Sequence, residues 1–129
     1  MGSLSNLKML DFDFNNLSGE IPRSIFNISS LEIIAFNDNS LSGHVPASTG
    51  LSLPNLDGIY LADNHLDGEF PISITNASKL IDLELSYNLF IGFIPKNLGN
   101  HRQLQFLNPK ILNLDFSILW WNVKCCNLL

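Results

Sequence analysis

The chain has 129 residues, of which 46% are hydrophobic and 15% are charged, and its formal net charge at pH 7 is −5. This length accommodates one domain with one core. Only 7 residues are Lys or Arg, so the clustered positive charge that nucleic-acid binding requires is missing, and we predict no nucleic-acid partner. The sequence contains neither an apolar run of 18 residues nor a signal-peptide pattern at its start. We therefore expect no membrane-spanning segment, no membrane contact by this chain itself and no secretory signal in it.

Four consecutive repeat units follow, beginning at Leu7, Leu31, Leu56 and Leu80, which are 24, 25 and 24 residues apart. Each unit has the pattern LxxLxLxxNxLxGxIP, with exchanges only among apolar residues. A repeat of this length is typical of a solenoid in which each unit buries its apolar side against the next unit. Since Leu10 and Phe12 alternate with Asp11 and Asp13, we expect a short strand in each unit, and the strands of successive units form one curved parallel sheet.

An asparagine follows each predicted strand, and a buried asparagine is stable only when its amide and carbonyl groups are hydrogen-bonded. We predict a hydrogen-bonded ladder along the solenoid, made of Asn15, Asn39, Asn64 and Asn88. The glycine of each unit suits a backbone position with positive φ, and the proline suits the point where strand pairing stops. After the proline, Ile25 and its equivalents Ile74 and Leu98 are predicted to pack inward from a 3₁₀ or irregular turn on the convex side.

The segments from Asn15 to Leu31, from Asn39 to Leu56 and from Asn88 to Asn100 resemble the plant-specific leucine-rich repeat. They are similar to the ectodomains of plant leucine-rich-repeat receptor-like serine/threonine kinases. The resemblance implies an α/β fold, a right-handed horseshoe with a short-stranded parallel sheet on its concave face and an irregular or 3₁₀ convex side. It also implies a location outside the cell at the plasma membrane, a peptide or protein ligand, and a co-receptor leucine-rich-repeat kinase.

Two regions are predicted from the repeat pattern. Residues 1–108 form the repeat array, with four full units and a partial fifth that begins with Leu104 and Leu107. Residues 109–129 form a degenerate tail, because Pro109 and Leu112 replace the expected leucine and asparagine.

The outward positions of the predicted strands and of the turns that follow them form the candidate ligand surface. Six of these sixteen positions are acidic and none is basic, which suits a ligand segment bearing Lys or Arg. The candidate ligand-binding residues are Asp11, Asp13, Phe14, Asn37, Asp38, Tyr60, Asp63, Asp82, Glu84, Ser86 and Tyr87. Acids on an exposed strand face also simply keep a sheet soluble, and this alternative stays open for each residue.

Other motifs add little chemistry. Three Asn-x-Ser sequons predict N-glycosylation at Asn16, Asn27 and Asn76, the last two in one convex column. The only cysteines, Cys125 and Cys126, are adjacent and form no disulfide framework. No kinase motif (GxGxxG, VAIK, HRD or DFG) is present, so we predict no catalytic residue, no metal and no cofactor.

The sequence thus favours a non-catalytic module for protein or peptide recognition, similar to part of the extracellular domain of a plant receptor kinase in defence or developmental signalling. Two alternatives remain. The chain is a stand-alone leucine-rich scaffold or hydrolase inhibitor, or it is a truncated gene fragment without independent activity.

Overall fold

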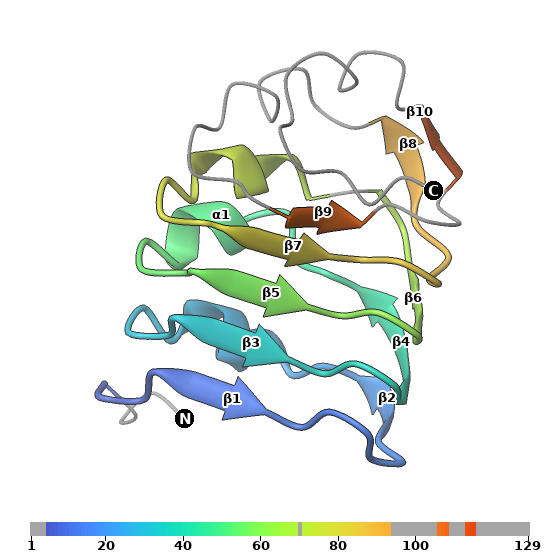
Figure 1. Ribbon diagram of the computed structural model, residues 1–129, viewed down its shortest axis with the longest axis horizontal. Coiled ribbons are helices and arrows are strands. Elements are labelled where there is room, and N and C mark those ends of the chain that lie inside the picture. The colour runs from blue at the N-terminus through green and yellow to red at the C-terminus, as the bar shows by residue number, and fades with distance from the viewer. Residues whose placement is uncertain (1–4, 70, 94–105, 109–112, 116–129) are drawn as a thin grey trace.

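In the computed structural model, residues 5–69, 71–93, 106–108 and 113–115 are described. The chain winds into successive coils, which we number one to four from Leu7, Leu31, Leu56 and Leu80 (Figure 1). Each of these four coils contributes one strand, and the segment after them a fifth, to a five-stranded parallel sheet whose order follows the chain. The strands are β1 (Met9–Asp11), β3 (Ile33–Ala35), β5 (Gly58–Tyr60), β7 (Asp82–Glu84) and β9 (Phe106–Asn108).

The register of this sheet stacks equivalent repeat positions on one another. Leu10 pairs with Ile34, Ile34 with Ile59, and Ile59 with Leu83. Because every coil places its apolar residues at the same height, the side chains that point away from the exposed sheet face form one continuous core. Ile34, Ile59 and Leu83 are at most 1% exposed, so the predicted leucine-rich solenoid is confirmed.

A second parallel sheet lies on one side of the coils, where the sequence had predicted only one sheet (Figure 1). It comprises β2 (Ser18–Glu20), β4 (Ser40–His44) and β6 (His65–Asp67), and a separate pair joins β8 (Ile91–Phe93) to β10 (Asn113–Asp115). Gly19 and Gly43 have φ of 80° and 85° and lie within these strands. The proline that follows each glycine lacks an N–H group, and Pro46 lies just beyond the end of β4.

Short helical turns form the opposite side of the coils. Two of them are 3₁₀ helices, η1 (Arg23–Asn27) and η2 (Ile72–Asn76), and Ile25 and Ile74 are buried beneath them as predicted. Coil two, which carries the extra residue, has instead one turn of α-helix, α1 (Thr49–Ser52). The predicted position of Leu98 lies outside the described residues.

Only a small part of the predicted tail is described. Within it, β10 pairs in parallel with β8, so this segment belongs to the separate two-stranded pair. None of the helical turns in the described residues has the length and apolar composition of a membrane-spanning helix.

Candidate functional site

The exposed face of the first sheet, with the turns that follow its strands, is the predicted ligand surface, and we call it the concave face. Its position depends on the asparagines beneath the turns. The side-chain Oδ1 of Asn39, Asn64 and Asn88 accepts the backbone N–H of Leu17, Leu41 and Leu66 of the preceding coil, at 2.9–3.1 Å. The same side chains donate through Nδ2 to preceding-coil carbonyls, those of Phe12, Phe36 and Leu61. All three asparagines are at most 8% exposed.

Asn15 differs from its three equivalents. It is exposed, and its Nδ2 donates within its own coil, to the carbonyls of Phe12 and Asp13 at 2.9 and 3.0 Å. Among the described residues, the bonds between coils are made by Asn39, Asn64 and Asn88, whereas those of Asn15 stay within coil one.

A second row of hydrogen bonds crosses the concave face itself, and the repeat pattern did not predict it. The Asp13 carboxylate accepts the backbone N–H of Asn37 at 2.6 Å, and Oδ1 of Asn37 accepts the N–H of Ala62 at 2.8 Å. Asp13 and Asn37 were predicted as ligand contacts, yet these bonds occupy part of their hydrogen-bonding capacity. Their main role in the described structure is to tie coils one, two and three together.

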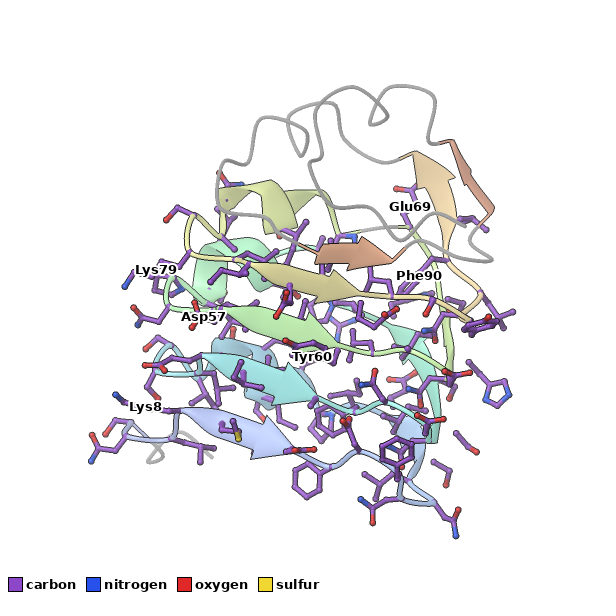
Figure 2. All side chains as sticks on the ribbon, viewed as in Figure 1. Lys8, Asp57, Tyr60, Glu69, Lys79 and Phe90 are labelled. Atoms are coloured by element: carbon purple, nitrogen blue, oxygen red, sulfur yellow. The ribbon has the colours of Figure 1, made fainter. Side chains whose placement is uncertain are left out.

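Tyr60 and Asp82 form the central pair of the concave face. The Tyr60 hydroxyl donates to Oδ2 of Asp82 at 2.6 Å, from β5 to β7. The ring of Tyr60 lies over Gly58, where an added Cβ would be 2.7 Å from the ring. Burial, followed by the hydrogen bond to Asp82 and the charge of Asp82, raises the pKa of Tyr60 above its ordinary value. The hydrogen bond thus holds the Tyr60 side chain, labelled in Figure 2, toward the neighbouring strand β7.

The turns after the four strands share a strained conformation. Phe14, Asp38, Asp63 and Tyr87 all have φ of 55–56°, which L-residues other than Asn and Asp seldom adopt. We call these residues the left-handed row. Each of the first three donates its backbone N–H to the next coil, to the carbonyls of Asn37, Ala62 and Ser86. Coils in a sheet are about 4.8 Å apart, so the row places two carboxylates side by side between two aromatic rings.

The electrostatics of this row follow from its acids. Partial burial, then the neighbouring charges of Asp38 and Glu84, raises the pKa of Asp63. No basic residue lies among the described positions of the concave face. Figure 2 shows Lys8 and Lys79 well apart, but both at the same end of the strands. There Lys8 faces Glu32 at 3.5 Å and Lys79 donates to Asn55. The acidic face therefore keeps its negative potential.

The remaining predicted ligand-contact residues differ in how far their side chains are exposed to solvent. Asp11, Phe14, Asp38, Asp63 and Tyr87 are exposed, and Phe14 is 77% exposed. Glu84 is half-buried and accepts hydrogen bonds from the backbone and hydroxyl of Ser86. Ser86 is only 2% exposed, and its hydroxyl donates to Glu84, so little of its side chain is open to a ligand in the described structure.

A pocket of about 390 Å³ lies away from the concave face. It is formed after β4 and β6 and is lined by Arg23, His44, Val45, Pro46, Ala47, Gly68, Glu69 and Pro71. His44 Nδ1 lies 2.8 Å from Oδ1 of Asp67 at its border. The sequence did not indicate this pocket, because its lining comes from three coils that only the fold brings together.

Comparison with known proteins agrees with this geometry. The family model for the leucine-rich repeat matches residues 6–28 and 79–101. No curated protein matches the chain in sequence.

Solved structures match over most of the chain. The HAESA receptor kinase of Arabidopsis, crystallised with the peptide hormone IDA and the co-receptor SERK1, is 41% identical with a TM-score of 0.72, covering 80% of this chain and 17% of HAESA. The leucine-rich-repeat ectodomain of GASSHO1/SCHENGEN3 from Arabidopsis thaliana, a plant membrane receptor kinase bound to CASPARIAN STRIP INTEGRITY FACTOR 2, is 35% identical with a TM-score of 0.81. That match covers 86% of this chain and 13% of the ectodomain.

A TDR receptor is 33% identical with a TM-score of 0.87, over 97% of this chain and 22% of the receptor. The chain thus spans between an eighth and a quarter of the length of these three structures. The chain is a leucine-rich-repeat solenoid similar, over most of its length, to the ectodomains of plant leucine-rich-repeat receptor kinases.

Proposed function

We propose that this chain is a non-catalytic recognition module that binds a basic peptide or protein segment across its concave face, outside the cell, as part of a receptor. The observation that carries the proposal is the charge of that face, which has six acidic positions and no basic one among its described residues. The solved relatives crystallised with a peptide hormone or an integrity factor support the class of ligand. By the same analogy, we propose a co-receptor leucine-rich-repeat kinase as a second partner.

The left-handed row provides the proposed anchor. Asp38 and Asp63 are exposed neighbours whose charges repel each other, and a Lys or Arg side chain placed between them relieves that repulsion. Phe14 and Tyr87 flank the two acids, and Tyr87 is 38% exposed. Aromatic rings beside carboxylates favour a cationic side chain through both cation–π attraction and buried area.

The rigidity of the surface also favours recognition. The buried asparagines and the Asp13–Asn37–Ala62 bonds hold the row from below and from the side. A surface whose shape is fixed before binding loses little conformational entropy when a ligand docks.

Binding of fluorescent dodecapeptides that differ only in the number of lysines tests the proposal by fluorescence anisotropy. We expect affinity to rise with lysine content and to fall as salt is raised, because surface charge attraction is screened. The Asp38→Asn/Asp63→Asn double variant keeps the shape of both side chains and should weaken binding about tenfold or more.

The matched control is Glu20→Gln/Glu69→Gln, which removes the same number of charges beside the second sheet. This control should bind almost as the unmodified protein does. Equal losses in both double variants would mean that net charge alone drives binding, and the concave-face proposal would fail.

We further propose N-glycans on the convex side. Asn27 and Asn76 are the last residues of η1 and η2, and both are exposed, as is Asn16 in coil one. Glycans at Asn27 and Asn76 leave the concave face open. Expression through a eukaryotic secretory pathway should give a mass increase that peptide-N-glycosidase removes and that Asn27→Gln and Asn76→Gln each reduce. An unglycosylated secreted product would contradict this part of the proposal.

A further inference from the structure

The pocket that follows β4 and β6 takes no part in the proposed concave-face site. We call it the lateral pocket. Its volume is about 390 Å³, at the small end of the range for ligand sites, so it suits a few side chains of a partner instead of a large ligand. Its described lining comes from three successive coils: Arg23 from coil one, residues 44–47 from coil two, and Gly68, Glu69 and Pro71 from coil three.

The buried part of this lining is apolar. Val45 is 5% exposed and belongs to the continuous core, and Pro71 is buried as well. Pro46 and Ala47 are more open to solvent and continue the apolar surface between them. Because each proline ring fixes its own φ, this part of the lining has its shape before a ligand arrives.

His44 is held as one wall of the lateral pocket. Its Nδ1 lies 2.8 Å from Oδ1 of Asp67, in the next coil. The imidazole ring also lies over Gly68, where an added Cβ would collide with Nδ1. The absence of a side chain at Gly68 therefore lets the ring reach from coil two to coil three, which closes this border of the pocket.

Two exposed side chains of opposite charge come from the first and the third coil of the lining. Arg23 is the first residue of η1, and Glu69 follows β6 and lies beside β8 (Figure 2). Within the part of the chain that the structure describes, no ion pair reaches either side chain. Adjacent coils are about 4.8 Å apart, so roughly 10 Å separate the coils of the two charges. Both charges are thus open to a ligand, at separate points.

We propose that the lateral pocket is a second binding site, for an extended peptide segment of a partner protein with the pattern acidic-x-apolar-x-basic. Alternate side chains of an extended segment point the same way and are about 7 Å apart, so three of them reach from coil one to coil three. The planar guanidinium of Arg23 pairs with the acidic side chain. The apolar side chain lies against Val45 and Pro71, and Glu69 pairs with the basic one.

The charges of the lateral pocket distinguish its ligand from that of the concave face. Arg23 and Glu69 balance each other, whereas the concave face has acidic positions and no basic one among its described residues. A segment that is basic throughout suits the concave face, but Arg23 repels it from the lateral pocket. The two sites therefore select different segments, and this inference does not rest on the proposed function.

NMR spectra of the full ¹⁵N-labelled chain, titrated with the capped pentapeptide Glu-Thr-Leu-Thr-Lys, test the proposal. We expect saturable shifts of the backbone amide signals of Val45, Ala47 and Gly68. Three further capped peptides each lack one feature of the pattern: Glu-Thr-Ser-Thr-Lys, Lys-Thr-Leu-Thr-Lys and Glu-Thr-Leu-Thr-Glu. Each should bind at these amides about threefold or more weakly, because one contact is lost.

Arg23→Glu tests the specificity of the lateral pocket. This variant should weaken binding of Glu-Thr-Leu-Thr-Lys and make Lys-Thr-Leu-Thr-Lys the preferred ligand at the same amides, because both charges of the pocket are then negative. The matched control, Lys79→Glu, makes the same change of charge at an exposed cation outside the pocket and should leave the order of preference unchanged. Asp38→Asn/Asp63→Asn should also leave it unchanged, which separates this site from the concave face.

Two results would overturn the lateral-pocket proposal. The first is the absence of shifts at Val45, Ala47 and Gly68 with Glu-Thr-Leu-Thr-Lys at about 10 mM. The second is an order of peptide preference that is the same in Arg23→Glu and in Lys79→Glu. Both results are independent of whether basic peptides bind the concave face.

Discussion

Oδ1 of Asn64 accepts the backbone N–H of Leu41 at 3.0 Å, although the two residues lie 23 positions apart in the chain. The same side chain donates to the carbonyls of Phe36, Leu61 and Ala62 at 2.8–3.2 Å. One carboxamide thus completes the turn of its own coil and fastens that coil to the preceding one. This linkage positions the left-handed row, since Asp63 immediately precedes Asn64.

Asn64→Leu should lower the free energy of unfolding by about 3 kcal/mol, because it leaves the N–H of Leu41 and several carbonyls buried without partners. Asn15→Leu, at the equivalent exposed position, should change stability by less than about 0.5 kcal/mol. Urea unfolding followed by circular dichroism measures both. Equal losses at the two positions would show that the asparagine column acts through local turn preference instead of through links between coils.

Asp63→Asn should stabilise the protein near neutral pH and not at about pH 3. The folded-state pKa of Asp63 is raised above 3.8, so its charged form is disfavoured in the folded protein, and the folded state binds the proton more tightly. Stability from this group is present below the ordinary pKa and is lost as pH rises through the raised folded pKa. Any effect of the left-handed turn on Asn is independent of pH.

Melting temperatures of the variant and the parent across pH 3–8 provide the measurement. The difference between them should grow as pH rises and then level off. A difference that is constant across this range would mean that Asp63 carries no electrostatic penalty from Asp38 and Glu84.

Gly50→Ala should destabilise the fold more than Gly19→Ala does. A Cβ at Gly50 would overlap the backbone of Ser73, where α1 packs against η2 and the N–H of Gly50 donates to Oγ of Ser73 at 2.9 Å. A Cβ at Gly19 meets nothing within 4 Å, so its cost is the positive φ alone, about 1 kcal/mol. Thermal unfolding of the two variants compares the cost of the steric overlap at Gly50 with the cost of the positive φ at Gly19. A larger loss of stability in Gly19→Ala would contradict the packing of α1 on η2.

The repeat columns predicted the fold because each column places one residue type at the same position of every coil, where the neighbouring coil buries it or bonds to it. Ile34, Ile59 and Leu83 are buried where the pattern placed them, and Ile25 and Ile74 pack under the short helices. The second sheet was missed because a Leu-Ser-Gly segment carries no period of two, and its pairing depends on neighbouring coils.

The concave face was predicted less completely. Its acids could be named from the strand alternation, but alternation does not reveal that Asp13 bonds to Asn37 or that Tyr60 reaches Asp82. The positive φ shared by Phe14 and Tyr87 could not be predicted from the sequence either, since aromatic residues rarely adopt it. Two aspartates directly before the ladder asparagines were the only signal for that conformation.

Native-state hydrogen exchange at the amides of Leu41 and Leu66 tests most directly whether buried asparagines lock each coil to the one before it. These amides donate to Asn64 and Asn88, so both should exchange only through global unfolding, with protection that follows urea stability. Asn64→Leu should release the amide of Leu41 while that of Leu66 stays protected. If, in the unmodified protein, both amides exchanged as fast as the exposed amide of Asn16, the result would contradict the interlocked solenoid on which the concave face depends.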